Sequence, residues 1–110
     1  MRDEKKRRLE AKGWKVGGVK DLLGLSDDEL AYIELKLKLG HSLKARRRAR
    51  RLTQIALARK IRSSQSRVAK MEAGDPTVTL DLLVRSLLAL GASNRELAKI
   101  ISSKVVIQST

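Results

Sequence analysis

The side chains best suited to bind a ligand are the basic residues gathered between Lys44 and Lys70. This stretch of 27 residues contains eleven Lys and Arg residues and no Asp or Glu. It supplies most of the formal net charge of +13, because the rest of the chain has 14 basic and 12 acidic residues. A charge concentrated on one segment creates a local field that attracts polyanions. The distribution of charge therefore predicts a surface that binds nucleic acid.

The composition leaves few residues for other kinds of site. The chain has one His, no Cys and no Phe, so metal ligands and aromatic rings that stack on single-stranded bases are almost absent. His41 stands beside Gly40, and we favour a plain helix residue over a metal ligand or a catalytic base. We therefore expect no catalytic residue, no metal, no cofactor and no enzymatic activity.

The length and the hydrophobic content indicate a single folded domain. A chain of 110 residues with 42% hydrophobic residues can bury one core and is too short for two independent domains. The absence of Cys fits an intracellular protein, and no apolar stretch approaches the length of a membrane-spanning helix. We expect a cytoplasmic protein of bacterial or phage origin that does not bind membranes.

A capping box predicts the start of the first long helix. Ser26 is followed three residues later by Glu29, and in this pair each side chain accepts a hydrogen bond from the other residue's backbone. Over residues 33–39 apolar and charged side chains alternate, which is the period of a strand. We favour a helix because the apolar residues also recur at spacings of three and four without an interrupting turn. Gly40 is the expected position of a bend.

The second half of the chain divides into four further helices, each preceded by a Ser or Thr that can cap it. The capping residues are Thr53, Ser64, Thr79 and Ser93, and the helices are expected over residues 54–61, 65–72, 80–90 and 94–102. A break of two residues, Arg62 and Ser63, separates the first two of these helices. The whole pattern predicts an all-α fold of about five helices.

Two segments of this region follow a known pattern of apolar and polar residues. They are LTQIALA at residues 52–58 and SQSRVAKMEAG at residues 64–74. In this pattern and its trailing Glu-x-Gly, the chain resembles the lambda-repressor-like (Xre/Cro) helix-turn-helix family across roughly residues 39–101. The resemblance implies a lambda-repressor-like DNA-binding domain whose second helix of the pair enters the major groove of double-stranded DNA.

The resemblance also divides the chain into segments, and at one position the sequence differs from the family pattern. The expected segments are a mobile basic N-terminus at 1–12, an N-terminal extension with the start of the first long helix at 13–38, the helix-turn-helix domain at 39–102, and a C-terminal tail at 103–110. Arg51 stands where family members often have Gly to end the first helix in a left-handed conformation. Arg can adopt that conformation only at a modest cost, so the first helix could end differently or overrun.

Carried onto this sequence, the family's base-reading positions correspond to Gln65, Ser66 and Lys70. Amide groups suit adenine, and a lysine can reach the acceptors of guanine. Polar residues in a first turn also commonly satisfy their own backbone, and Lys70 could instead be only solvated. The family's phosphate-contact position corresponds to Gln54, and further phosphate candidates are Arg62, Ser64, Arg67, Thr77 and Thr79.

One pair of charged residues has a structural assignment in the family. Arg47 corresponds to the position that pairs with Glu72, the acidic residue at the edge of the basic stretch. The resemblance implies a partly buried ion pair that ties the first helix to the recognition helix. The other arginines of residues 46–51 could form only a solvated helix face, which is the usual role of a run of charge.

The helix expected over residues 80–90 has too many apolar residues for a single face. A helix that is apolar nearly all round must be covered on both sides, and a small domain can cover one. We therefore expect a homodimer on a palindromic operator, with recognition helices about 34 Å apart. The residues expected in the dimer interface are Leu82, Leu87, Leu88, Leu97, Ile100 and Ile101.

The leading functional hypothesis is a sequence-specific transcriptional regulator, most simply a repressor. Residues 13–37 resemble the extension of HigA-type antitoxins, which implies a RelE-like toxin as a partner and autoregulation of the operon. Two other hypotheses stay open. The domain also resembles coactivators of the multiprotein-bridging kind, and the basic stretch could instead bind nucleic acid without sequence preference.

Overall fold

A computed structural model describes residues 22–104 of the chain. These residues form five helices and no strand, which confirms the all-α fold predicted from the sequence. The helices are α3 (Asp27–Ala49), α4 (Gln54–Lys60), α5 (Gln65–Ala73), α6 (Leu80–Ala89) and α7 (Asn94–Ser102). The predictions for the N-terminus at 1–12, for residues 13–21 of the extension and for residues 105–110 of the tail lie outside the described residues.

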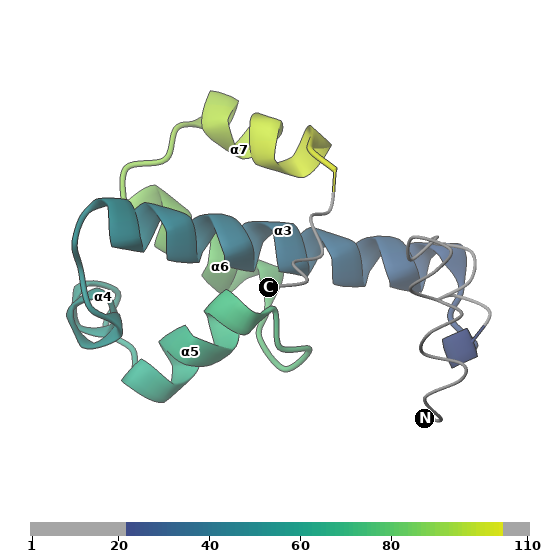
Figure 1. Cartoon of the computed structure of the whole chain (residues 1–110), viewed down its shortest axis with the longest axis horizontal. Coiled ribbons are helices and arrows are strands. Elements are labelled where there is room, and N and C mark those ends of the chain that lie inside the picture. Colours follow the sequence, from purple (N-terminus) through teal and green to yellow (C-terminus); the bar gives the residue numbers. More distant parts are fainter. Residues whose placement is uncertain (1–21, 105–110) are drawn as a thin grey trace. The chain divides into compact units, whose positions relative to one another are not determined.

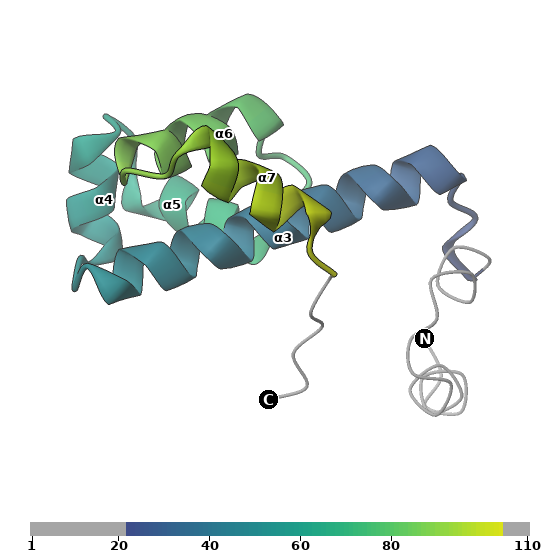
Figure 2. The same ribbon diagram turned by 90° about the horizontal axis from the view of Figure 1, so that it is seen from above.

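The chain divides into two compact units, residues 1–32 and residues 33–110. The second unit holds most of α3 and all of α4 to α7. Within it, α5 and α7 lie on opposite sides of α3, as the two perpendicular views of Figures 1 and 2 show. No helix of the described chain is both long and apolar enough to cross a membrane.

The predicted capping residues begin their helices as expected. Ser26 and Glu29 form the reciprocal capping box, with Glu29 Oε1 accepting from Ser26 N at 2.9 Å. The hydroxyl oxygens of Thr53, Ser64 and Thr79 each accept from the backbone N–H three residues later. A second capping box starts α7. The helix ends differ from the prediction by one residue at most, because the last turn is set by backbone geometry that periodicity does not report.

The expected bend at Gly40 is wrong, because α3 continues unbroken across it. The glycine is required for a different reason. A Cβ atom built on Gly40 would lie 2.3 Å from the carbonyl oxygen of Met71 and 3.3 Å from that of Glu72. Gly40 therefore allows the C-terminal backbone of α5 to approach the axis of α3 more closely than any side chain would permit.

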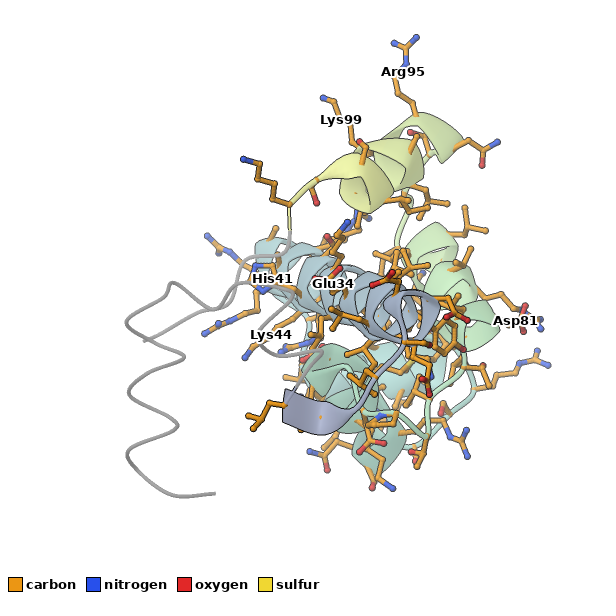
Figure 3. All side chains as sticks on the ribbon, turned by 90° about the vertical axis from the view of Figure 1, so that its right-hand side faces the viewer. Glu34, His41, Lys44, Asp81, Arg95 and Lys99 are labelled. Carbon is orange, nitrogen blue, oxygen red and sulfur yellow. The ribbon has the colours of Figure 1, made fainter. Side chains whose placement is uncertain are left out.

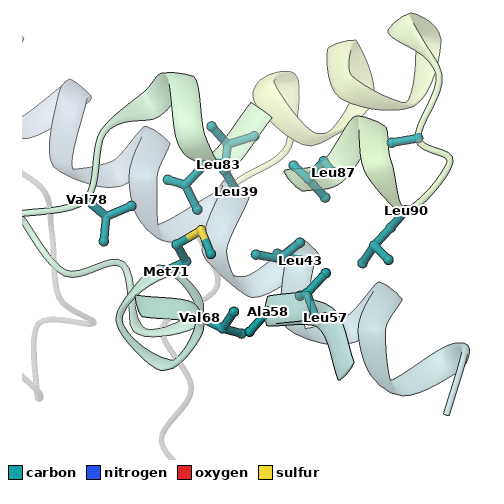
Figure 4. Close-up of a cluster of buried hydrophobic side chains, with 11 residues drawn as sticks. Leu39, Leu43, Leu57, Ala58, Val68, Met71, Val78, Leu83, Leu87 and Leu90 are labelled. Carbon is teal, nitrogen blue, oxygen red and sulfur yellow. The ribbon is translucent and has the colours of Figure 1, made fainter. Parts of the chain in front are cut away.

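The core of the second unit is built from apolar side chains of α3 to α6 and of the segments after α5 and α6 (Figure 4). Leu43, Leu57, Val68 and Met71 are completely buried. The cluster comprises Leu39, Leu43, Leu57, Ala58, Val68, Met71, Val78, Leu83, Leu87, Leu90 and Ala92. Four helices thus contribute to one continuous core, which fixes the position of α5 relative to α3 and α4.

The burial of α6 corrects part of the expected dimer interface. Leu87 has no exposed surface and belongs to the core, so it is not available to a second copy of the chain. Other apolar residues of α6, including Leu82, are partly buried against the same core. The helix is covered more fully within one copy than expected, because its inward side chains belong to the core shared with α3, α4 and α5 and Ser86 Oγ donates to Met71 Sδ at 3.5 Å. Leu88 stays 45% exposed.

Helix α7 is attached by few buried groups. It has no buried residue, and only Leu97 and Ile100 pack against the core. Polar contacts with α3 supplement them: Arg46 pairs with Glu96, and Lys38 Nζ donates to the carbonyl oxygen of Ile101 at 2.8 Å. The pKa of Glu96 is held below its ordinary value, first by the backbone N–H of Ser93 and then by the Arg46 side chain.

The contact at Gly40 predicts the effect of a single methyl group. An alanine in an exposed helix would add about 1 kcal/mol of stability relative to glycine. At Gly40 we expect the opposite, a loss of about 1–3 kcal/mol, because Gly40→Ala must displace the backbone of α5. Urea unfolding followed by circular dichroism measures the difference, and a more stable variant would contradict the close contact.

Candidate nucleic-acid interface

Helices α4 and α5 are joined by a short turn at Ile61 to Ser64. The turn begins with two backbone hydrogen bonds, from Ser63 N to the oxygen of Ala58 at 2.7 Å and from Arg62 N to that of Arg59 at 3.2 Å. These bonds occupy carbonyl groups that the end of a helix otherwise leaves without a partner. The chain then re-enters a helix at once, because Ser64 caps α5. The result is two helices joined by a turn whose backbone groups are hydrogen-bonded.

An ion pair between α3 and the end of α5 holds this pair of helices in place. Arg47 Nε lies 2.5 Å from Glu72 Oε2, and Arg47 Nη2 lies 3.1 Å from Glu72 Oε1. The side chains are 12% and 3% exposed. Arg47 Nη1 also donates to the carbonyl oxygen of Leu52 at 2.7 Å, which ties the segment before α4 to the same guanidinium.

Two glutamines extend this network to the start of α5. Gln54 Nε2 donates to Glu72 Oε1 at 3.1 Å, and Gln65 Nε2 donates to Gln54 Oε1 at 3.1 Å. A carboxylate only accepts hydrogen bonds, so Gln54 must turn its amide nitrogen toward Glu72 and its oxygen toward Gln65. The orientation of the Gln65 amide follows from this arrangement. Gln65 keeps its oxygen and one N–H for other partners.

The exposed face of α5 borders a shallow hollow on the surface. Ser66, Arg67 and Lys70 are exposed side chains of α5 that point away from the buried Val68 and Met71. The hollow is lined by Ser64, Ser66, Arg67, Lys70, Thr77 and Val78. The structure thus brings together five of the predicted contact residues, from α5 and from the segment that follows it.

The polar groups of Thr77 are occupied within the protein. Its backbone N and its Oγ1 both donate to Asp75 Oδ1, at 2.8 and 2.6 Å. These bonds, the side-chain bond first, hold the pKa of Asp75 below its ordinary value. A negative carboxylate beside Thr77 opposes the approach of a phosphate, so the geometry does not favour this predicted contact. Thr79 caps α6, with its Oγ1 accepting from Leu82 N at 3.2 Å.

Arg62 lies apart from the hollow beside α5. It lines a second hollow between the end of α4 and α6, together with Lys60, Asp81 and Arg85. Figure 3 shows Asp81 on the opposite side of the unit from His41 and Lys44 of α3. Five of the predicted contact residues therefore line the hollow beside α5, and Arg62 and Thr79 are not among them.

Lys36 is a structural residue that the sequence reading missed. It is only 6% exposed, and its Nζ donates to the carbonyl oxygen of Pro76 at 2.9 Å. Its place on α3 three residues before Leu39 and seven before Leu43 puts it on the buried face. That spacing could have identified it, but the alternation of Lys and Leu concealed the helical period.

The comparisons with known proteins agree with this geometry. Residues 38–100 match a family model described as a helix-turn-helix domain. The match covers more than half of the 110 residues, and the chain belongs to the helix-turn-helix domain family. Membership supports a DNA-binding regulator in general. No curated protein and no solved structure gives a significant match.

The buried ion pair predicts a strong effect of removing one partner. Arg47→Met leaves the Glu72 carboxylate buried with Gln54 as its remaining partner, and we expect a loss of about 3 kcal/mol in the free energy of unfolding. The double variant Arg47→Met/Glu72→Leu removes both charges and should recover most of the loss. Chemical denaturation of the three proteins measures the recovery, and equal instability of the single and double variants would contradict this view.

Proposed function

We propose that the protein is a sequence-specific transcriptional regulator that binds double-stranded DNA through α5 and acts as a repressor. The observation that carries the proposal is the exposed face of α5. Ser66, Arg67 and Lys70 project from a helix whose opposite face is fixed by the core and by the Glu72 ion pair. A rigid helix with polar and basic side chains on its free face suits the major groove.

The glutamine pair supports direct reading of an adenine. The Gln54 contact orients the Gln65 amide, which keeps one N–H donor and its oxygen acceptor for a ligand. Adenine presents an acceptor at N7 and a donor at N6 in the major groove, and a glutamine matches both. In this proposal Gln65 reads an adenine, while Ser66 and Lys70 contact neighbouring base edges.

Phosphate contacts are proposed on both sides of these base contacts. Gln54 has a second amide hydrogen that its bond to Glu72 does not use, and Arg67 lines the hollow beside α5. Ser64 and Thr79 use their hydroxyl oxygens as acceptors in capping bonds, which leaves each hydroxyl hydrogen for a phosphate. Each contact releases counterions, so affinity should fall steeply as salt is raised.

Selection from random duplex DNA tests the proposal. At about 150 mM salt, where charge interactions are already partly screened, we expect the wild-type protein to enrich one defined sequence. Ser66→Ala and Lys70→Ala should abolish or change the enriched bases while keeping part of the overall affinity, because base contacts specify and phosphate contacts position. Each good base contact contributes about 1–3 kcal/mol of discrimination.

A matched control removes a lysine from another face of the domain. Lys99 extends into solvent from α7, on the side of α3 opposite α5 (Figures 1 and 3). Lys99→Ala changes the net charge as Lys70→Ala does and should leave the selected sequence unchanged. An unenriched pool with the wild-type protein would contradict sequence-specific binding and favour non-specific binding by the basic residues or a protein-bridging role.

We also propose that the regulator is a homodimer on a palindromic operator. Leu88 on α6 and Ile101 on α7 are 45% and 48% exposed, and the partly buried Leu82, Leu97 and Ile100 lie on the same two helices. Two copies joined through these helices would present recognition helices about 34 Å apart.

Substitution of Leu88 tests the dimer. Leu88→Glu places a charge on the proposed interface, and light scattering at high micromolar concentration should then show a monomer. Ile55→Glu on α4 is the matched control, since Ile55 is 53% exposed and lies outside the proposed interface. A monomeric wild-type protein at that concentration would refute the dimer.

A role as the antitoxin of a toxin–antitoxin pair is the more specific form of this proposal. Its support in the described chain is a set of exposed apolar side chains in the first unit. Leu22, Leu23 and Tyr32 are 37%, 63% and 46% exposed, which suits contact with a second protein. The proposed partner is a RelE-like toxin encoded beside this protein. Co-expression with the adjoining gene should yield a complex and rescue growth.

A further inference from the structure

Arg51 and Arg62 have a left-handed backbone, with φ of +58° and +56°. In the described part of the chain they are the two residues other than glycine with positive φ. This region is costly for residues with a Cβ atom, which clashes with the neighbouring carbonyl oxygen. The equivalent positions after α5 and α6 are Gly74 and Gly91, so the chain uses glycine at two helix ends and arginine at two others.

The same pair of hydrogen bonds fixes both arginines. Leu52 N donates to the oxygen of Arg47 at 3.1 Å, and Arg51 N donates to that of Arg48 at 2.9 Å. After α4, the corresponding bonds join Ser63 to Ala58 and Arg62 to Arg59. This arrangement ends a helix with its last carbonyl groups satisfied and requires the left-handed residue. The end of α3 therefore keeps the expected geometry even though Arg51 replaces glycine.

A short repeat in the sequence sets each of these arginines three residues before one glutamine of the hydrogen-bonded pair. Residues 51–54 read Arg-Leu-Thr-Gln, and residues 62–65 read Arg-Ser-Ser-Gln. In each copy a left-handed Arg precedes a helix cap, and the Gln is the first residue of the next helix. The two glutamines are hydrogen-bonded to each other. The repeat thus puts one cation before α4 and one before α5.

Neither guanidinium has a partner within the described residues. Arg46 and Arg47 are paired with Glu96 and Glu72, whereas no hydrogen bond or ion pair joins the exposed Arg51 or Arg62 side chain to the described protein. The strained backbone is therefore held by the backbone hydrogen bonds alone, and neither side chain contributes a hydrogen bond or ion pair within the described domain. Strain of this kind is concentrated at functional sites.

We infer that Arg51 and Arg62, which precede the two helices joined by the Gln54–Gln65 hydrogen bond, are phosphate-binding residues that contact the DNA backbone. The guanidinium group binds phosphate through two parallel hydrogen bonds and stays charged at all relevant pH values. The inference rests on the proposed DNA-binding function and deepens it. It adds Arg51 to the interface and gives a reason for arginine where glycine would be less strained.

Glycine substitutions separate strain from function, because they should affect stability and binding in opposite directions. For Arg51→Gly and Arg62→Gly we expect a rise in Tm of about 2–5 °C as strain is relieved, partly offset by the greater freedom of glycine in the unfolded chain. Binding of the selected duplex should weaken by roughly 3- to 10-fold at about 150 mM salt. The slope of log affinity against log salt is negative, and it should become shallower by about 0.9 for each variant and by about twice that for the double variant.

Two controls complete the experiment. Arg95 extends into solvent from α7 (Figure 3), so Arg95→Ala removes the same charge from the other side of α3 and should leave the salt slope unchanged. Arg51→Lys and Arg62→Lys keep the charge and should keep the slope while losing part of the affinity. Fluorescence anisotropy over a salt series and thermal unfolding give both readouts.

Each result has a definite meaning. A higher Tm with weaker binding and a smaller slope supports the inference. Glycine variants that bind as tightly as the wild-type protein, with the same slope, would overturn it while leaving the proposed function intact. A lower Tm in both glycine variants would refute the strain on which it depends. A wild-type protein that binds no duplex would overturn the proposed function and this inference together.

Discussion

The structure depends on one nearly buried carboxylate. Glu72 is 3% exposed, and removing such a charge from water costs several kcal/mol unless its oxygens are fully used. Here three donors reach it, two from Arg47 and one from Gln54. Because the carboxylate cannot donate, it sets the orientation of the Gln54 amide, and Gln54 in turn sets that of Gln65. A charge at one end of α5 thus determines what the other end presents to solvent.

The backbones of α3 and α5 also approach each other closely at Gly40. The missing side chain at Gly40 admits the carbonyl oxygen of Met71, and Gly74 then turns the chain away beside Leu37. Lys36 holds the following segment through the oxygen of Pro76. The inner face of α5 is therefore fixed by packing, by charge and by backbone contacts. Its outer face carries the exposed side chains of Ser66, Arg67 and Lys70.

The remaining faces of the second unit have different chemistry. Helix α7 lies across α3 from α5 and is held by partial burial and polar contacts, whereas the face around α4 and α5 is basic and well anchored (Figure 1). Under the proposed function, α5 and its neighbours face DNA while α6 and α7 face a second copy. The two proposed contacts meet at the hollow that Arg62 and Leu82 both line, and elsewhere they use different helices.

The helices, their caps and the family pattern could be predicted from the amino-acid sequence, because capping and periodicity depend on residues a few positions apart. It also placed the basic surface between Lys44 and Lys70. Features that depend on contacts between segments far apart in the chain could not be predicted and are seen in the folded structure. Gly40 admits a backbone instead of bending a helix, Leu87 fills the core instead of an interface, and Lys36 is buried. Arg51 keeps a glycine's conformation, because hydrogen bonds at the end of α3 outweigh the preference of a single residue.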